Sequence, residues 1–398
     1  MSLLEEIADV GRDRTRGGYS RHGFDSADAE LREWFTERAA RLGLDVTGDR
    51  NGNLWAWWGA PGPDAVVTGS HLDSVPGGGE FDGPLGVTSA LDAVETLRAK
   101  GFTPNRPLAI AVFVEEEGGR FGVPCLGSKL TAGAIDPDAA RALRDPDGIS
   151  LAEATGEFGL DPEHLGPDEE TLGRIGCFVE LHVEQGRLLA KLDKPAPVAV
   201  ASSILAHGRW RFTVRGQGNH AGTTQLTERH DPMLPAATAV LAARRAASRH
   251  AGTRATIGRL TPVPGGTNVI ASSVDFWLDA RGMSRRETQD VVAEISTAAQ
   301  DASVAEGCDL VVREESYGDL VHFDAGLRDD LAAHLGGVPK IPTGAGHDAG
   351  VLAARVPTAM VFVRNPTGIS HAPEEHAEPA DCAAGTAALA EAVAHLCR

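Results

Sequence analysis

The sequence predicts an α/β protein: a main domain with a mixed sheet flanked by helices, plus an inserted ferredoxin-like α+β domain. Three observations predict it. The chain has 398 residues, more than one typical core holds. Strand and helix patterns alternate in its first part, as in layered α/β folds. The middle segment instead has the order β-α-β-β-α-β of the ferredoxin-like unit.

The first helix of the main domain is expected at residues 26–42. Leu31, Phe35 and Ala39 fall on one helical face there, and Gly43 is a stop signal. Short apolar runs between turn signals predict buried strands. They cover residues 65–68, 108–114, 175–181 and 357–363. A helical stretch at 85–100 separates the first two strands, which favours a sheet covered by helices.

The middle segment contains four strand patterns and two helix patterns. The strands are expected at 209–215, 254–260, 274–281 and 309–315, and the helices at 232–249 and 285–306. We therefore expect an inserted domain over 207–318, with the main domain formed by 1–206 and 319–398.

Composition excludes several classes of protein. A formal net charge of −19 argues against nucleic acid and anionic membranes as partners. No apolar run reaches the ~18 residues of a membrane span. The acidic N-terminus lacks a signal-peptide pattern. Five cysteines without CxxC spacing predict reduced thiols, and hence a cytoplasmic protein.

Metal-ligand side chains stand in short motifs along both flanks of the main domain. They are His71 and Asp82 in GSHLDSVPGGGEFDG, Glu116 and Glu117 in EEEGGRFG, His182 in ELHVEQG and His371 in ISHAPEE. Histidines with a carboxylate hold one Zn²⁺-like ion, and a second ion can share the middle carboxylate. Several of these residues follow predicted strands, and the carboxyl ends of strands in an α/β sheet meet at one edge. The motifs predict a dinuclear metallohydrolase that cleaves a C–N bond.

Asp82 is the best candidate for the carboxylate shared by both ions. Its glycine-rich loop permits unusual backbone geometry and close approach. Asp73, two residues after His71, is expected to orient that imidazole. Glu116 and Glu117 are adjacent, so their side chains diverge. One can bind metal while the other carries protons.

The remaining candidates are weaker on sequence alone. His220, Asn268, Arg281 and His347 are single polar residues, and Arg281 is as compatible with a surface ion pair. Two other classes stay open. A cysteine amidase could use Cys125, but the histidine motifs would then be unexplained. A binding protein on the same fold would have no need of a catalytic glutamate.

These motifs resemble the dinuclear-zinc aminoacylases and carboxypeptidases, in particular their amidase/hydantoinase/carbamoylase branch. The resemblance covers nearly the whole chain and includes NHAGTT (219–224), GGTNVI (265–270) and GAGHDA (344–349). Histidine at 182 marks the branch, because the peptidase relatives usually carry an acidic ligand there. The branch hydrolyses allantoate, N-carbamoyl-L-amino acids or β-ureidopropionate.

The resemblance implies a role for each candidate. One ion would be held by His71, Asp82 and His182, and the other by Asp82, Glu117 and His371. Glu116 would be general base and then acid. Substrate contacts would come from Gln185, His220, Asn268, Arg281 and His347. The inserted domain would mediate homodimerisation and lend residues, His220 among them, to the partner's site. The ions would be Zn²⁺ or Mn²⁺, with Co²⁺ or Ni²⁺ also suitable.

Four departures from the family pattern lie in the inserted domain. Gln225 and Leu226 stand where Pro and Met are usual, Ala271 where Pro is common, and His207–Gly208 where a Gln-Arg pair is frequent. They leave the metal ligands intact and put substrate identity in question. The resemblance suggests allantoate first, N-carbamoyl-L-amino acids second (β-ureidopropionase included), and an aminoacylase or dipeptidase activity third.

Overall fold

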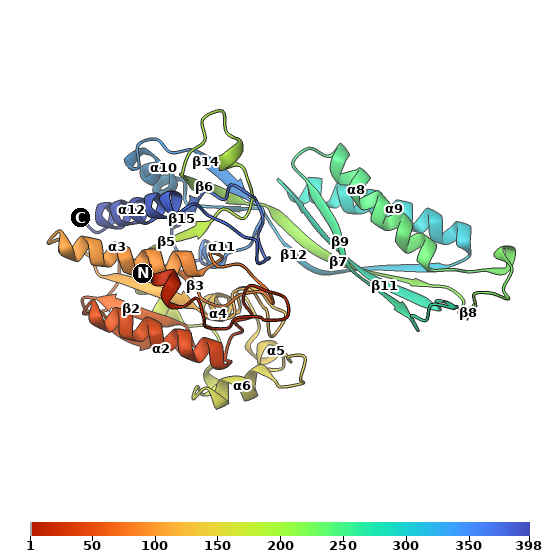
Figure 1. The fold of residues 1–398 in the computed structure, drawn as a ribbon, viewed down its shortest axis with the longest axis horizontal. Helices are drawn as coiled ribbons and strands as arrows, with labels where there is room; N and C mark the ends of the chain where they lie inside the picture. Colours follow the sequence, from red (N-terminus) through yellow and green to blue (C-terminus); the bar gives the residue numbers. More distant parts are fainter. Residues whose placement is uncertain (1) are drawn as a thin grey trace. The chain divides into compact units, whose positions relative to one another are not determined.

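The computed structural model describes residues 2–398, which form two compact units (Figure 1). The larger unit combines residues up to Ser203 with His322–Arg398, and the smaller unit is Ile204–Val321. The inserted domain expected at 207–318 falls within the smaller unit. Each unit has its own sheet and its own hydrophobic core.

The larger unit is built on a nine-stranded mixed sheet with the order β1-β2-β4-β3-β5-β15-β6-β13, in which β14 also pairs with β6. Its strands are β1 Asp45–Gly48, β2 Leu54–Trp58, β3 Ala65–His71, β4 Leu108–Phe113, β5 Ile175–Val183, β6 Val198–Ile204, β13 Val321–His322, β14 Lys340–Thr343 and β15 Thr358–Val363. Strands β4, β3, β5 and β15 run parallel to one another. They are almost entirely buried, as expected of parallel strands covered on both faces.

Helices flank this sheet, and several short ones lie in a smaller cluster beside it. They are α1 Leu3–Glu6, α2 Ser26–Arg41, α3 Pro84–Ala99, α4 Leu126–Ala132, α5 Pro137–Arg141, α6 Leu151–Glu157, α7 Glu169–Leu172, α10 Ala325–His334, α11 Asp348–Leu352 and α12 Pro379–Leu396. Helices α3 and α12 lie side by side (Figure 1) and join the strands in one core. Among residues 2–398, no helix is long and apolar enough to cross a membrane.

The smaller unit has the element order β7 Ala206–Arg215, α8 Met233–Arg249, β9 Arg254–Val263, β11 Ser273–Gly282, α9 Arg285–Glu306 and β12 Asp309–Gly318. Its antiparallel sheet has the strand order β12-β7-β11-β9. Alternate residues of β7 and β11 are buried, which places one face of the sheet against α8 and α9. A short ladder, β8 Asn219–His220 with β10 Val269–Ile270, forms a second sheet.

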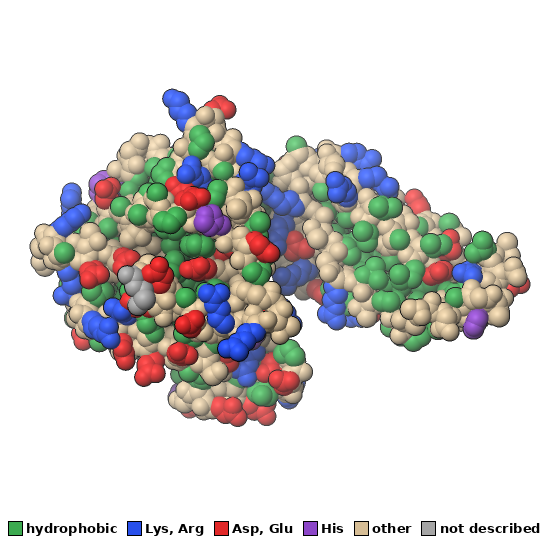
Figure 2. Space-filling model, viewed as in Figure 1, with side chains coloured by type: hydrophobic (Ala, Val, Ile, Leu, Met, Phe, Trp, Pro, Cys, Tyr) green, Lys and Arg blue, Asp and Glu red, His purple; other side chains and the backbone are tan. Residues whose placement is uncertain are grey.

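Hydrophobic side chains gather on the surface of the smaller unit (Figure 2). On α8, Leu234 is 50% exposed and Leu241 is 61% exposed. A monomer seldom leaves neighbouring large apolar side chains in water without a reason. This helix surface is therefore a candidate for contact with another chain.

The prediction of a mixed α/β protein with a large sheet flanked by helices is confirmed. Helix α9 has the predicted bounds, and the central strands begin within a few residues of their expected positions. Helix α12 was not predicted. All five cysteines are free thiols, as expected.

Candidate metal centre

Three neighbouring parallel strands deliver the first site residues to one edge of the sheet. His71 is the last residue of β3, and His182 is the penultimate residue of β5. Glu116 and Glu117 follow β4 after a short loop. Because these strands are parallel, their carboxyl ends meet at the same edge. The chain therefore concentrates imidazoles and carboxylates at one place.

His71, Asp82 and His182 form a first group of metal-type donors. One ligand atom from each lies within 4.8 Å of the others. His182 Nε2 is 3.2 Å from Asp82 Oδ1, and all three side chains are buried. Two imidazoles and one carboxylate are a donor set that suits Zn²⁺ and its neighbours.

Asp82, Glu117 and His371 form a second such group around the same aspartate. His371 Nε2 lies 3.4 Å from Asp82 Oδ2 and 3.4 Å from Glu117 Oε2. The two oxygens of Asp82 thus face different groups. Such a carboxylate can join two metal ions, which in two-metal enzymes stand ~3.5–4 Å apart.

Local backbone geometry places Asp82 here. Gly83 follows it with φ of 87°, and a Cβ at that position would lie 2.3 Å from the His71 ring. Only glycine permits both the conformation and the close approach. The Glu375 carboxylate accepts the backbone N–H groups of Phe81 and Asp82, each at 3.0 Å. The loop that carries Asp82 is fixed from a distant part of the chain.

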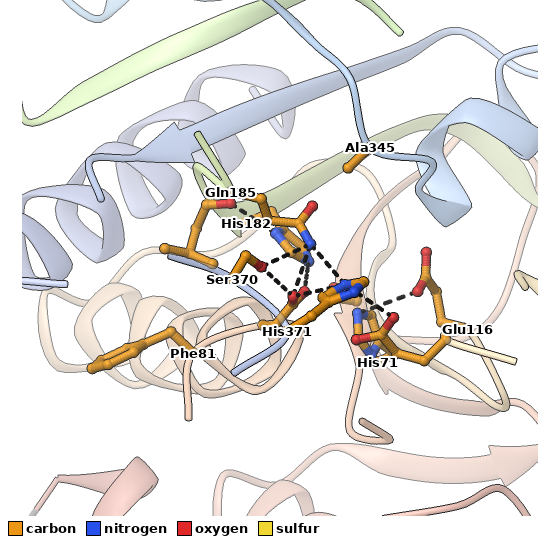
Figure 3. A network of polar contacts seen from close by, with 12 residues as sticks. His71, Phe81, Glu116, His182, Gln185, Ala345, Ser370 and His371 are labelled. Atoms are coloured by element: carbon orange, nitrogen blue, oxygen red, sulfur yellow. Dashed lines mark hydrogen bonds and ion pairs between the residues drawn. The ribbon is translucent and has the colours of Figure 1, made fainter. Parts of the chain in front are cut away.

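Further donors hold the Asp82 carboxylate (Figure 3). Gln185 Nε2 donates to Asp82 Oδ2 at 2.7 Å, and Ser370 Oγ donates to the same oxygen at 2.9 Å. Ser370 is also 3.1 Å from Glu375. Gln185, predicted to contact substrate, is therefore a neighbour of the proposed metal ligands.

Asp73 orients its neighbours in two ways. The His71 ring contacts its backbone oxygen, with Nδ1 at 3.0 Å, while its carboxylate lies farther away at 3.5 Å. That carboxylate accepts the backbone N–H groups of Glu116 and Glu117 at 3.1 and 3.0 Å. This arrangement leaves His71 Nε2 to face the site, as in metal-ligating histidines.

Burial dominates the electrostatics of the carboxylates. It raises the pKa of Glu116 and Glu117 well above the usual range. Burial also acts to raise the pKa of Asp82, but the hydrogen bond and charge of His182, with help from His371, hold it well below its usual value. The Asp82 carboxylate is therefore ionised, while burial favours the protonated forms of Glu116 and Glu117.

The carboxylates around the site histidines favour positive charge there. Burial lowers the pKa of His71, but the carboxylates around it, Glu116 foremost, outweigh that effect and raise it. Glu117 Oε1 is buried and has no hydrogen-bond partner among the described residues, and the buried His182 Nε2 faces only the Asp82 carboxylate, 3.2 Å away. Buried polar atoms without partners are costly, and a bound metal ion would satisfy both. The donors present therefore fit a dinuclear metal site.

Glu116 lies beside the first group without belonging to either triad. Its Oε2 is 3.6 Å from His71 Nε2, and its Oε1 accepts a hydrogen bond from Cys125 Sγ at 3.3 Å. One carboxylate oxygen is thus held from behind while the other faces the metal-type donors. That is the geometry a proton carrier needs.

His347 packs against the first group. Its ring centroid is 4.5 Å from that of His182, and its buried Nε2 has no hydrogen-bond partner among the described residues. Burial, followed by the neighbouring His182, lowers its pKa well below the ordinary value. A neutral imidazole can donate or accept one hydrogen bond to a substrate.

Three predicted substrate residues lie in the smaller unit. His220 and Asn268 adjoin the β8–β10 ladder, where the Ala221 N–H donates to the Asn268 carbonyl at 3.0 Å. Arg281 lies near the end of β11 and forms a two-point ion pair with Asp279 at 2.8 and 3.1 Å. The structure thus brings His220 and Asn268 together, and both metal-type groups are built without these three residues.

Sequence reasoning assigned no role to Ser370, Glu375 or Asp348. Each lies in a motif that holds a predicted residue. Ser370 directly precedes His371, Asp348 directly follows His347, and Glu375 ends the segment ISHAPEE. Their positions in ISHAPEE and GAGHDA were the available signal. Cys125 was weighed only as a nucleophile. It is buried beside Glu116, and burial raises its thiol pKa well above the usual value, which disfavours that role.

Most of the chain is similar in sequence to known proteins. Residues 67–395 match the model of Peptidase family M20/M25/M40. The N-carbamoyl-L-amino acid amidohydrolase of Geobacillus stearothermophilus is 36% identical over 392 residues, 97% of this chain and 95% of that protein. The allantoate amidohydrolase of Escherichia coli K12 is 31% identical over 383 residues, 94% of this chain and 92% of that protein.

A solved structure agrees with these sequence matches. The amidase of the hydantoinase/carbamoylase family from Burkholderia vietnamiensis has a TM-score of 0.87 and 30% identity. The match covers 99% of this chain and 95% of that one.

Proposed function

The chain belongs to Peptidase family M20/M25/M40, a family of metal-dependent hydrolases, and on that premise we propose that it hydrolyses the ureido C–N bond of a ureido acid. The observation that carries this proposal is the pair of donor triads that share Asp82, with Glu116 beside them. The chain is a hydrolase acting on C–N bonds.

The geometry of the two triads supports one ligand set for each of two ions. We propose that His71, Asp82 and His182 hold one divalent ion and that Asp82, Glu117 and His371 hold the other. When bound, two such ions supply Lewis-acid polarisation of a carbonyl and a water of lowered pKa. Mixed imidazole and carboxylate donors suit Zn²⁺, Mn²⁺, Co²⁺ and Ni²⁺.

Glu116 is the proposed proton carrier. Its buried carboxylate takes a proton from the attacking water through Oε2, while Cys125 holds Oε1. The same group then delivers that proton to the leaving nitrogen. Burial favours the protonated form of Glu116, which suits the second half of this cycle.

The substrate contacts are assigned as proposals. His347 and Gln185 are polar groups of the larger unit that contact the triads, His347 beside His182 and Gln185 on Asp82. Arg281 would bind the substrate carboxylate through its planar fork after exchanging its partner Asp279. We propose that the smaller unit dimerises and acts as a lid, with the exposed apolar side chains of α8 as part of the contact.

We place N-carbamoyl-L-amino acids ahead of allantoate as substrates. This reverses the order suggested by sequence motifs, because the N-carbamoyl-L-amino acid amidohydrolase is 36% identical and the allantoate amidohydrolase 31%. Both compounds combine a ureido group with a carboxylate, so one site chemistry serves either. A cytoplasmic location stays a prediction from cysteine usage.

The test is ammonia release from allantoate and a panel of N-carbamoyl-L-amino acids, after chelation and after return of Mn²⁺ or Zn²⁺. We expect release that depends on metal, and the preferred compound then identifies the substrate. If metal binds but no ureido acid is hydrolysed, the proposal fails and the dipeptides and N-acyl amino acids become the compounds to assay.

A further inference from the structure

Besides the two triads, and a group that shares His182 with them (Glu180, His182 and His347), one group of metal-type donors has no member in either triad. It consists of Glu116, Cys125 and Asp348, with one donor atom from each within 4.8 Å of the others. All three side chains are buried, with exposures of 5%, 5% and 0%. A thiol and two carboxyls enclosed together resemble a site for a soft or borderline cation more than a packing contact.

The backbone directs Cys125 toward Glu116. Cys125 has φ of 54°, in the left-handed region, and stands immediately before α4. Its N–H donates to the Glu116 carbonyl at 2.5 Å, and its Sγ lies 3.3 Å from Glu116 Oε1. The chain turns back on itself between Gly118 and Gly122. Main-chain and side-chain hydrogen bonds therefore hold Cys125 beside Glu116.

Asp348 reaches the same place from another part of the chain. It is the first residue of α11, and one oxygen, Oδ1, accepts a hydrogen bond from Ser128 Oγ. Its other oxygen, Oδ2, is buried and has no hydrogen-bond partner among the described residues. A buried carboxylate oxygen left unpaired is costly, and a cation is the ligand that satisfies it.

We propose that Glu116, Cys125 and Asp348 form a third, inhibitory cation site that prefers thiophilic divalent ions such as Zn²⁺ and Cd²⁺. As the ion binds, a sulfur–metal bond forms, and the thiol proton of Cys125 and the protons that burial keeps on Glu116 and Asp348 pass to solvent. The carboxylates of Glu116 and Asp348 supply the oxygen donors. The inhibition rests on the proposed function, because a cation on Glu116 removes the proton carrier.

The same chemistry separates metals. Thiolate ligands select Zn²⁺ and Cd²⁺, whereas Mn²⁺ prefers oxygen donors and forms weaker complexes with most sites. Mn²⁺ therefore fills the two triads and leaves the Glu116 carboxylate free to carry protons. Excess Zn²⁺ reaches the third site and stops the reaction.

Cd²⁺ titration of the chelated protein tests the site without any assay of activity. We expect three equivalents to bind, one of them with the ultraviolet charge-transfer band of a Cd²⁺–thiolate bond. Cys125→Ala and Cys125→Ser should each bind two equivalents without the band. Cys177→Ala, which removes a different buried thiol in β5, should keep it. Binding of only two equivalents, or a band that survives in folded Cys125→Ala, overturns the proposal.

A second arm uses the Mn²⁺-loaded enzyme on its preferred ureido acid. Excess Zn²⁺ should lower its rate by about 10²–10⁴-fold, the range for loss of a general base. Cys125→Ala has a lower rate of its own, because Cys125 holds Glu116 Oε1, but the ratio of its rates with and without Zn²⁺ should stay about one. Equal inhibition of both proteins overturns the inhibitory role. If no ureido acid is hydrolysed, the proposed function fails, while the Cd²⁺ band still decides whether the site exists.

Discussion

The two units of this chain differ in where they keep their charge. The smaller unit, Ile204–Val321, holds 13 arginines, no lysine and 13 acidic residues, so its formal charge is zero. The rest of the chain holds 24 basic and 43 acidic residues and therefore the entire net charge of −19. A diffuse negative field attracts cations. The unit with the metal-type donors is the unit that has this field.

The two units also differ in the charged side chains that they bury. Within Ile204–Val321, the buried polar side chains are Thr224, Thr288 and Ser303, and none is charged. The larger unit buries twelve carboxylates and three of its site histidines. They include His71, Asp82, Glu116, Glu180, His182, Asp348 and Glu375. Buried charges are costly unless they are paired or bind a metal. In the larger unit, the buried charges belong mostly to the candidate site. The smaller unit has an ordinary apolar core.

The largest expected effect comes from Glu116→Gln in the larger unit. The amide cannot take a proton from water, so we expect kcat to fall by about 10²–10⁴-fold. Glu116 belongs to neither triad, so both ions should remain. Rate measurements combined with metal analysis test this. Glu374→Gln, an exposed change near His371, is the matched control and should be neutral. Near-normal kcat in Glu116→Gln would remove this residue from catalysis.

The next effect tests whether the smaller unit takes part in the chemistry at all. His220 Nδ1 accepts the N–H groups of Gly222 and Thr223 at 3.1 and 3.2 Å, so the ring proton lies on Nε2. We propose that this N–H is an oxyanion donor, and its loss in His220→Ala should then lower kcat/KM by about 10²-fold.

Metal content should stay unchanged in that variant, since His220 belongs to none of the metal-type groups of the described residues. His250→Ala, a surface histidine of the same unit paired with Glu294, is the control. Full activity in His220→Ala would confine the chemistry to the larger unit.

The candidate site shows which parts of such a centre the sequence reveals. The metal-type donors sit in short motifs at strand ends, so residue type and position predicted that His71, Asp82 and His182 would converge. The supporting contacts were not predictable in this way. Glu375 accepts the N–H of Asp82 across 293 residues of sequence, and Ser128 meets Asp348 across 220. Only the folded chain pairs such distant groups.

The fold divides in the same manner. Strands β3, β4 and β5 are continuous apolar runs because both faces are buried, and such runs are readily predicted. Helix α12 is alanine-rich, and alanine gives little contrast between a buried and an exposed face. Short helices such as α4 are set by loop geometry, here the left-handed Cys125, rather than by a repeating pattern.

Metal removal should destabilise one unit and not the other. Ligand binding adds about 2.7 kcal/mol of stability when the free ion is at 100 times its Kd. We therefore expect a chelator to increase amide hydrogen exchange in β3 and β5, which carry His71 and His182, and to leave α8 and α9 unchanged. Asp82→Asn, which breaks both triads, should exchange alike with and without chelator. An equal response of both units would contradict the division of labour.

The smallest effect concerns Asp28, a buried acid of the larger unit outside the metal-type groups. Burial raises its pKa from 3.8 to about 6, although Arg32 opposes the shift. The folded state then binds the proton more tightly than the unfolded state. The stability that Asp28 contributes is complete below pH 4 or so and is lost as pH rises through about 6.

Asp28→Asn mimics the protonated acid and can still accept the Phe24 N–H, which lies 2.8 Å from the carboxylate. At pH 7 the variant should therefore exceed the wild type in free energy of unfolding by about 1–2 kcal/mol, less than the full two-unit shift because the helix N-terminus favours an anion. At about pH 3, below the pKa of the unfolded state, the difference should nearly vanish. Urea unfolding at both pH values measures it, with Glu33→Gln, exposed on the same helix, as control. A variant less stable at pH 7 would show that this buried carboxylate is held by its partners, as the site carboxylates are.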